Sequence, residues 1–567
     1  MSIPAVTGWK KGETGSRLRD VLCRELNVSP YFALILMNRG VITPDSARDF
    51  LFGDLSSCHD PHLLKDMDRA VERIRRAISS GEKIMVYGDY DVDGITSTAL
   101  LAQVLRFMGG RVETFIPHRI EDGYGVNSDA VQLAARRQVG LIVTVDCGVS
   151  SIEEVRIARG MGVDVVVTDH HEVREGRLPE AYAVVAPHRE DCKYPFKELA
   201  GVGIAYKLAR VLMEGNEEYV DGYLDLVALG TIADVAPLVG ENRFLAKAGL
   251  EKLRITDRPG IKALVEVAGL DQRSLTCRNI SFAIAPRINA MGRMGAPDAA
   301  LDIFTTGDRT KAAKIASDLD RENRNRQSVE RQILKNAIER TRLEVDHERD
   351  KVIVLADDSW HPGVIGIVAS RIVEEFSKPA ILISLDGGEG KGSGRAVPGF
   401  DLFKAVGGAG EFLEGFGGHE SACGIRIREN MVDSFKKKVN SIADEYPCSQ
   451  ETLPDIPVDA EIPLSELGIG LIRELDLLMP YGPGNAEPVF RTNGLKVRSR
   501  PREIGRSGIK FLVTDGRAHC EAITFRKNSI SRPSVGDKVD LVHTPSVNGY
   551  GGIDSVQLNI KALRGAG

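Results

Sequence analysis

The sequence predicts an α/β protein made of a parallel-sheet domain, a long helix, a second α/β domain and a C-terminal β-barrel. Three observations support this prediction. Residues 83–190 alternate short β-rich runs with amphipathic segments, residues 309–346 contain no Gly or Pro, and the segment from about 456 is rich in Val, Ile, Gly and turn signals. A chain of 567 residues is also too long for one hydrophobic core, so several domains are expected.

The alternating region consists of repeated β-α units. Helical spacing of apolar residues between the strand candidates indicates a largely parallel sheet with helices on both faces. Ligands of such sheets gather at the carboxyl ends of the strands. The predicted strands are 83–89, 111–117, 140–146, 163–169 and 181–187, and the predicted helices are 96–109, 127–138 and 151–162.

The remainder of the chain divides by the same criteria. Residues 199–300 are mainly helical in pattern, and the uninterrupted stretch 309–346 predicts one long connecting helix. A second α/β unit follows, with "KVIVLADD", "GVIGIVASRIVEEF" and "PAILISL", and ends near residue 447. The last segment, with "DG" and "NG" turns between β-rich runs, predicts a small β-barrel.

The composition predicts a soluble protein of a bacterial-type cytoplasm. Hydrophobic residues make up 43% and charged residues 27% of the chain, which suits globular cores. No window approaches the roughly 20 apolar residues of a membrane span, and the start "MSIPAVTGWKKGETG" lacks the apolar centre of a secretory signal. The eight cysteines include no C-x-x-C pair, which argues against a zinc module or a disulfide framework.

The formal net charge of −6 is unevenly distributed. From Lys496 to the end there are 13 Lys/Arg against 6 Asp/Glu, so the C-terminal segment is basic and the rest of the chain is acidic. A basic module on an acidic body suggests a surface that binds a polyanion. The alternative is an ordinary solvated basic face.

Acidic motifs follow three of the predicted strands: "GDYDVDG" (88–94), "VDCG" (145–148) and "TDHHE" (168–172). A fourth, "LGTIADVAPL" (229–238), places a carboxylate among apolar residues, where it needs a partner. The topology brings the strand-end residues to one edge of the sheet, where the carboxylates repel one another unless a cation neutralises them. These strand-end residues are Asp91, Asp93, Asp146, Asp169, His170 and His171, and the carboxylate of the fourth motif is Asp234.

Carboxylates with imidazole, and without thiolates, predict Mn²⁺ or Mg²⁺ as the cation. Two ions about 3.5–4 Å apart would use this number of ligands and would suit phosphoryl hydrolysis. Any single strand-end Asp is more often a helix cap or a turn former than a ligand. Four acidic motifs in this order are a much more specific signal.

These motifs resemble those of the DHH phosphoesterase superfamily and, within it, of the RecJ family of single-stranded-DNA-specific exonucleases. The resemblance covers nearly the whole chain, in order. It continues through "PHRIEDGYG" (117–125), "LAGVGIAYKLA" (199–209), "APRINAMGRMG" (285–295), "WHPGVIGIVASRI" (360–372), "GSGRAVPGFDL" (392–402), "GFGGHESACG" (415–424) and "MPYGPGNAEPVF" (479–490).

The resemblance implies a DHH catalytic domain facing a DHH-associated domain across a cleft, with an OB-fold completing the molecule. The expected boundaries are 1–70 for an N-terminal helical segment, 71–308 for the DHH domain, 309–346 for the long helix, 347–449 for the DHH-associated domain and 456–567 for an OB-fold that binds nucleic acid. The implied activity is 5′-to-3′ hydrolysis of single-stranded DNA to mononucleotides with two Mn²⁺ or Mg²⁺ ions, in DNA recombination and repair.

By motif match, the resemblance implies Asp91, Asp93, Asp146, His170 and Asp234 as metal ligands, with Asp146 bridging the two ions. Asp89 and His171 complete the implied catalytic set as groups behind the ligands or on the substrate side. For Asp169 two roles are open: it binds metal, or it orients the adjacent imidazole.

An exonuclease that starts at a 5′ end must hold that end, and guanidinium groups beside glycines suit phosphate oxygens. The substrate-binding candidates are Arg119, Arg287, Arg293, Ser393, Arg395 and His419. For each Arg alone, a salt bridge at the surface or between domains is an equally good interpretation. In the C-terminal domain, Phe511, Phe525 and Tyr550 are candidates for base stacking, with at least one of them expected in the core.

Two alternatives remain open at this level. The first is another DHH hydrolase, acting on oligoribonucleotides, cyclic dinucleotides or pyrophosphate; the segment 456–567 argues against it, because those chains usually lack the barrel. The second is a catalytically inactive scaffold, and the presence of every motif acid argues against that. The expected partners are single-stranded DNA and, by resemblance, a helicase and a single-strand-binding protein, with a monomeric state and no membrane association.

Overall fold

A computed structural model describes residues 15–118, 125–173, 176–294, 298–445, 456–505, 508–525, 532–549 and 554–565. Its contacts divide the chain into two compact units, which are described separately below. The larger unit comprises Asp60–Asp234 and Gly249–Gln450, and the smaller unit comprises Met1–His59, Val235–Ala248 and Glu451–Gly567. Over the described ranges, no helix combines the length and apolar character needed to cross a membrane.

The first sheet of the larger unit confirms the five predicted strands. All its neighbouring strands are parallel, in the order β2-β1-β3-β4-β5. β1, β3, β4 and β5 are almost wholly buried, as their apolar runs require, and the edge strand β2 is half-buried. Their bounds are β1 Lys83–Tyr87, β2 Arg111–Phe115, β3 Val139–Val145, β4 Asp164–Thr168 and β5 Ala183–Val185.

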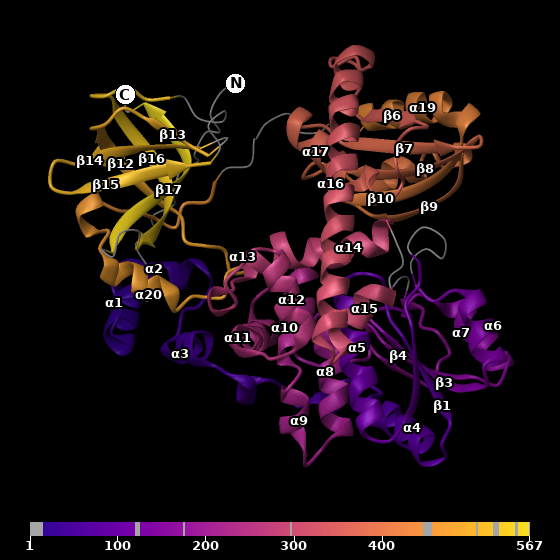
Figure 1. Ribbon diagram of the computed structural model, residues 1–567. Helices are drawn as coiled ribbons and strands as arrows, with labels where there is room; N and C mark the ends of the chain where they lie inside the picture. The colour runs from indigo at the N-terminus through magenta and orange to yellow at the C-terminus, as the bar shows by residue number, and fades with distance from the viewer. Residues whose placement is uncertain are drawn as a thin grey trace. The chain divides into compact units, whose positions relative to one another are not determined.

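Helices cover both faces of this sheet (Figure 1). On one face, Met85 and Tyr87 of β1 share a core with α6 and α7; α4, α5 and α8 contact the strands from the other side. The bounds of these helices are α4 Met67–Ser79, α5 Val92–Phe107, α6 Ser128–Arg136, α7 Ile152–Gly160 and α8 Gly201–Leu212.

Helices follow the sheet up to residue 344, as the sequence pattern predicted. The longest is α16, Arg309–Glu344, which runs from the first sheet's domain to the second (Figure 1). A π-helical turn, Ile280–Ile284, leads directly into α14, which lies against α16. The other helices are α9 Glu217–Asp221, α10 Leu224–Ala233, α11 Gly240–Ile255, α12 Pro259–Val267, α13 Cys277–Asn279, α14 Ala285–Met294 and α15 Asp298–Thr305.

The second sheet of the larger unit is mixed, in the order β6-β7-β8-β10-β9. Helix α17 packs on β7 and β8, while α18 and α19 supply Leu402, Phe435 and Val439 to the core on the opposite face. The bounds are β6 Ile353–Asp357, α17 Ile365–Phe376, β7 Ala380–Asp386, β8 Glu389–Arg395, α18 Leu402–Gly407, β9 Leu413–His419, β10 Ala422–Arg428 and α19 Val432–Glu445.

The smaller unit joins the two ends of the chain in one core. Phe32 and Leu36 of the N-terminal helices pack with Phe490, Leu541 and other residues of the C-terminal strands. Inside this unit, the buried guanidinium of Arg243 donates hydrogen bonds to the carbonyl oxygens of Phe50, Leu477, Leu478 and Met479. The helices are α1 Gly15–Leu26, α2 Pro30–Asn38, α3 Pro44–Phe52 and α20 Ile469–Asp476.

The C-terminal strands form one sheet in the order β11-β12-β16-β17-β15-β14-β13. A further pairing of two residues, Lys496 with Thr514 and Val497 with Val513, links β12 back to β14. Closure as a full barrel stays a prediction. The bounds are β11 Ala460–Glu461, β12 Phe490–Val497, β13 Arg502–Ile504, β14 Gly508–Thr514, β15 His519–Thr524, β16 Lys538–Asn548 and β17 Ser555–Gly565.

Candidate active site

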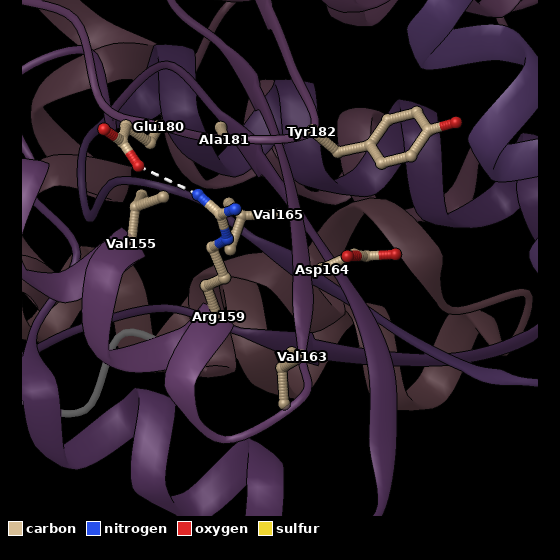
Figure 2. A pocket seen from close by; sticks show the side chains of 8 residues that line it. All are labelled: Val155, Arg159, Val163, Asp164, Val165, Glu180, Ala181 and Tyr182. Atoms are coloured by element: carbon tan, nitrogen blue, oxygen red, sulfur yellow. Dashed lines mark hydrogen bonds and ion pairs between the residues drawn. The ribbon is translucent and has the colours of Figure 1, made fainter.

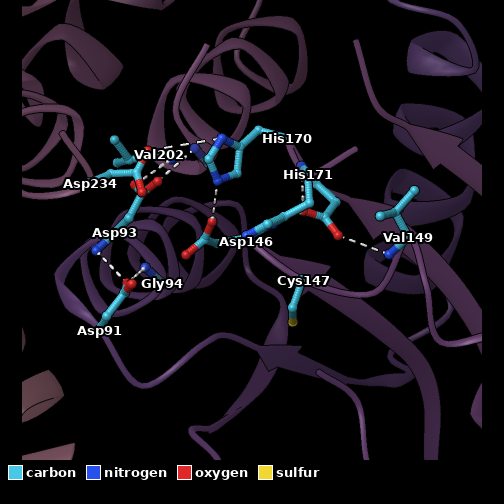
Figure 3. Close-up of polar contacts among 12 residues, drawn as sticks. Asp91, Asp93, Gly94, Asp146, Cys147, Val149, His170, His171, Val202 and Asp234 are labelled. Atoms are coloured by element: carbon cyan, nitrogen blue, oxygen red, sulfur yellow. Dashed lines mark hydrogen bonds and ion pairs between the residues drawn. The ribbon is translucent and has the colours of Figure 1, made fainter. Parts of the chain in front are cut away.

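The acidic motifs lie at the carboxyl ends of three adjacent strands, β1, β3 and β4 (Figure 3). Strand β1 has β2 on one side and β3 on the other, so the chain changes direction across the sheet between β1 and β3. This is the position at which open α/β sheets bind their ligands. Asp89, Asp91 and Asp93 follow β1, Asp146 follows β3, and Asp169, His170 and His171 follow β4.

Asp91 and Asp93 sit at the start of α5 and are held by main-chain N–H groups. Asp91 is the N-cap, and its Oδ1 accepts hydrogen bonds from the N–H groups of Asp93 and Gly94 at 2.9 and 3.2 Å. Buried Asp93 accepts from the N–H groups of Gly201 and Val202, at the start of α8, at 2.7 and 2.8 Å. Asp91 is therefore both a helix cap and a ligand candidate.

Asp146 lies at the centre of the cluster in a left-handed conformation, with φ of 61°. A side chain at Gly201 would place its Cβ 2.5 Å from Asp146 Oδ1, so only glycine fits there. The Nε2 atom of His170 lies 3.1 Å from Asp146 Oδ1. Both atoms are buried, and neither has a hydrogen-bond partner among the described residues.

Asp169 has a structural role beside the cluster. Its Oδ2 accepts from the N–H of Val149 at 2.8 Å, and its Oδ1 lies 2.7 Å from Nδ1 of His171. Asp169 thereby fixes the ring of His171, as expected for a carboxylate that orients an imidazole.

Asp234 completes the site from a different element, as the C-cap of α10. Its Oδ2 lies 4.0 Å from His170 Nδ1. Three sets of residues each offer ligand atoms that lie within 4.8 Å of one another, and Asp146 and His170 each belong to two of the sets. The sets are Asp146 with His170 and His171, Asp93 with His170 and Asp234, and Asp89 with Asp91 and Asp146.

Burial and mutual repulsion shift the pKa values of the clustered groups. Burial and the neighbouring carboxylates raise the pKa of Asp93, Asp146 and Asp234 well above the usual carboxyl range. Burial and the charge of His171 lower the pKa of His170 to about 4, so its imidazole is neutral and can bind a cation. For His171, burial is outweighed by Asp169, which raises the pKa to about 9.

The donor set fits divalent cations. Carboxylate oxygens with one or two imidazole nitrogens are ligands of Mn²⁺ and Mg²⁺, and cations would ionise the carboxylates that now repel one another. Asp146 Oδ1 and His170 Nε2, which lie 3.1 Å apart and have no hydrogen-bond partner among the described residues, are the atoms that such an ion would bind first.

Of the arginines predicted to bind substrate, two contact other parts of the protein and one is not described by the structure. Arg119 lies outside the described residues. Arg287 is held in an ion pair with Asp320 of α16 at 3.0 Å, and Arg293 donates to the carbonyl oxygen of Gly363 at 3.2 Å.

Three other candidates share one face of the second sheet. Arg395 of β8 and His419 of β9 both pair with Ala422 of β10, so all three side chains point to the same side. Ser393 lies two residues before Arg395 on that face, and Arg395 Nη1 donates to Ser393 Oγ at 3.1 Å. Gly424 and Gly417 follow Ser393 across the sheet, so the face is open to close approach by a ligand.

A pocket of about 410 Å³ lies away from this cluster (Figure 2). Its lining includes Asp164, the first residue of β4, so the pocket is at the amino end of the strand, opposite the acidic motifs. Asp164 is paired with Arg73, and Arg159 with Glu180. The pocket contributes nothing to the metal cluster.

The sequence did not reveal two features of the site. The first is the pair of N–H groups at the start of α8 that bind Asp93. The motif "LAGVGIAYKLA" contains them, but only the fold shows what they contact. The second is that the ring of His171, predicted to lie behind the ligands or on the substrate side, belongs to one of the three possible ligand sets.

Comparison with protein families identifies all three domains. The chain matches the DHH family, N-terminal domain, over residues 83–231, the DHHA1 domain over 349–445 and the RecJ OB domain over 458–562.

Relatives match over most of the chain. The single-stranded-DNA-specific exonuclease RecJ of Bacillus subtilis is 37% identical, covering 95% of this chain and 68% of the relative. That of Escherichia coli is 34% identical, covering 88% and 90%. The crystal structure of RecJ in complex with Mn²⁺ from Thermus thermophilus superposes with a TM-score of 0.82 at 31% identity, covering 97% of this chain and 78% of that one. From these relatives and the three domain matches, the chain belongs to the RecJ family of DHH proteins.

Proposed function

We propose that this protein is a metal-dependent exonuclease that hydrolyses single-stranded DNA from the 5′ end and releases mononucleotides. The observation that carries the proposal is the cluster of three overlapping ligand sets at the switch point of the first sheet. Relatives named single-stranded-DNA-specific exonucleases and a RecJ structure with Mn²⁺ support it.

The metal ligands in this proposal are Asp91, Asp93, Asp146, His170 and Asp234. Asp146 belongs to two of the three ligand sets, which suits a bridge between two ions. When bound, the ions would activate a water molecule and stabilise charge on the phosphate and the leaving oxygen. The protein groups fix this geometry: α8 orients Asp93 through two N–H groups, and Asp169 orients His171.

The 5′ end is assigned to the face of the second sheet that carries Ser393, Arg395 and His419. Guanidinium and hydroxyl donors suit the oxygens of a terminal phosphate, and the glycines between the strands admit the backbone. Arg119 and Arg293 are the other proposed contacts with DNA. If this face holds the 5′ end while the metal site cleaves, cleavage would start at the 5′ terminus.

In the cell, such an activity would serve DNA recombination and repair in the cytoplasm. A helicase would supply single strands, and a single-strand-binding protein would coat them. We propose that the protein works there as a monomer. Sedimentation of the purified protein, alone and with each partner, tests the monomeric state and the binding of the two partners.

The direct test is digestion of end-labelled single strands with and without a 5′ block, in Mn²⁺ and in Mg²⁺. We expect mononucleotides from the 5′ end, no cleavage of blunt duplex and inhibition by chelation. The Arg395→Ala variant should raise KM for 5′-phosphorylated strands more than it lowers kcat, because the arginine holds the end in ground and transition states alike. Release of nucleotides from the 3′ end first, or equal digestion of duplex, would overturn the proposed polarity.

A further inference from the structure

Helix α14 contacts the proposed metal-binding turn through the side chain of Asn289. Its Oδ1 accepts a hydrogen bond from the main-chain N–H of Val92 at 3.1 Å. Val92 lies between Asp91 and Asp93, so this bond acts on the two residues of the proposed ligand set that lie on α5.

The hydrogen bond completes the N-terminus of α5. The first N–H groups of a helix have no partner within it, and the Asp91 side chain satisfies only those of Asp93 and Gly94. The N–H of Val92 is satisfied by Asn289, which lies on a helix almost two hundred residues farther along the chain. Without it, the turn would lose a hydrogen bond from the α14 side, and the N–H of Val92 would lose its acceptor.

A second contact brings α14 close to the same turn. A Cβ at Gly292, one turn after Asn289, would lie 2.9 Å from the carbonyl oxygen of Tyr90. The helix thus runs against the turn with no room for a side chain at this position, and small shifts of α14 would move the turn with it.

The same helix continues the contact to the second sheet. Arg293, four residues after Asn289 and on the same side of α14, donates to the carbonyl oxygen of Gly363 at 3.2 Å. Gly363 precedes α17, in which Gly366 packs so close to β8 that a Cβ there would lie 2.9 Å from Ser393 Oγ. A continuous chain of contacts therefore connects the proposed metal ligands with the proposed phosphate-binding face.

We infer that Asn289 is a positioning residue: by binding the Val92 N–H it fixes Asp91 and Asp93 for metal binding and anchors the metal turn to α14. The inference rests on the proposed function, since it assigns a support to the proposed ligands. It assigns Asn289 no contact with DNA or metal.

The test is the affinity for Mn²⁺ in the absence of DNA, measured from the electron paramagnetic resonance signal of free Mn²⁺. The Asn289→Ala variant should bind Mn²⁺ about tenfold more weakly, the usual scale for loss of a group that orients metal ligands. Its kcat should fall while KM for the DNA end stays unchanged. The Asn289→Asp variant, which keeps the acceptor oxygen, should recover most of the affinity.

Asn440→Ala is the matched control. Asn440 also uses its side-chain oxygen to accept main-chain N–H groups, those of Lys351 and Val352, but within the second sheet's domain. This variant should lower the melting temperature and leave Mn²⁺ affinity at the wild-type value. If Asn289→Ala is folded by its melting curve and binds Mn²⁺ as the wild type does, the inference is wrong. If the wild type itself neither binds Mn²⁺ nor cleaves DNA, the proposed function fails instead.

Discussion

Single residues determine the chemistry of the site, and the role of Asp146 can be tested most directly. It is buried, adopts a left-handed backbone conformation and belongs to two ligand sets. The Asp146→Asn variant keeps the size of the side chain but removes the charge that a bridging ligand needs. We expect at least about a 10³-fold loss of kcat, the scale for losing one electrostatic stabiliser of the transition state.

Single-turnover cleavage of a labelled strand measures this loss, and the melting curve checks the fold. The control is Asp257→Asn, which removes an exposed carboxylate paired with Lys262 and should leave the rate unchanged. Near-normal turnover of Asp146→Asn would exclude a shared ligand at this position.

The pH dependence of metal binding follows from the same residues. The pKa values of Asp93, Asp146 and Asp234 are raised by burial and mutual repulsion, so the metal-free fold holds protons that the unfolded chain releases at lower pH. These groups therefore cost the metal-free protein stability as the pH rises above the ordinary carboxyl pKa. Divalent cations need the ionised form, so the stabilisation they give should grow with pH.

The measurement is the rise in Tm on adding saturating Mn²⁺, at pH 6 and at pH 8, against a chelated sample. We expect the larger rise at pH 8, with each proton displaced by the metal contributing up to about 1.4 kcal/mol per pH unit. In the Asp146→Asn variant, the Mn²⁺-induced rise in Tm should differ less between pH 6 and pH 8. A Tm shift independent of pH would mean that no proton leaves when the metal binds.

The sequence predicted that these side chains would lie close together, but it did not predict the groups that hold them in place. Asp91, Asp146 and His170 were found because each follows an apolar strand, and parallel strands end at one edge. The N–H groups of Gly201 and Val202 and the oxygen of Asn289 were not found, because their positions depend on where distant helices pack. No local pattern encodes such contacts.

At the scale of elements, the strands and the long helix were predictable from periodicity, but the partners of charged side chains were not. Arg287 was a candidate for phosphate binding because it lies in a motif with glycines. In the structure, its guanidinium bonds to Asp320 of α16 and to the carbonyl oxygen of Ala283. Asp320 also pairs with exposed Arg324 at 2.7 Å.

These contacts predict a role for Arg287 in joining α14 to α16. Replacing it by Ala should destabilise the fold by about 1–3 kcal/mol, because it leaves a largely buried carboxylate with one partner instead of two. KM for DNA should stay unchanged. Chemical denaturation measures the free energy of unfolding, and steady-state kinetics measure KM.

Arg324→Ala is the matched control, since it removes the exposed partner of the same carboxylate and should cost less than about 1 kcal/mol. A large rise in KM for Arg287→Ala, with stability preserved, would return this residue to the DNA-binding set.

At the scale of the whole molecule, the grouping of the chain's two ends could not have been predicted. Phe32 and Leu36 lie more than 400 residues from Phe490 and Leu541, yet they share one core. The sequence treated the N-terminal helices and the C-terminal strands as separate domains, because no short-range pattern relates segments so far apart. Deleting residues from 456 onward would therefore expose the apolar faces of the N-terminal helices, and such a truncation would not test DNA binding alone.

The basic surface of the C-terminal strands allows a sharper test. Lys496, at the end of β12, and Arg498 and Arg500, just after it, are exposed and lie at alternate positions of the chain. In the part of the chain that the structure describes, none of them forms an ion pair. Leu512, 43% exposed, lies beside Arg498.

Of the candidates for base stacking, Phe511 is in the core, Phe525 is 65% exposed and Tyr550 lies outside the described residues.

If these three cations contact the phosphates of a long strand, replacing all three by Gln should weaken binding and reduce its salt dependence. The slope of log affinity against log salt should fall by up to about 2, since each contact with a single strand contributes about 0.7. Fluorescence anisotropy with a labelled long strand at several salt concentrations gives the slope. Cleavage of very short strands should persist, because the proposed catalytic residues belong to the larger unit.

The control replaces Lys436, Lys437 and Lys438 of α19 by Gln, which changes the net charge by the same amount on a different surface. If both triple variants reduce the slope equally, the effect comes from overall charge and the C-terminal strands are no special contact for DNA. If only the Lys496, Arg498 and Arg500 variant reduces it, this face carries the strand beyond the site of cleavage. A surface of unpaired cations without base-reading groups then explains how one enzyme can act on strands of any sequence, because phosphate contacts carry no sequence information.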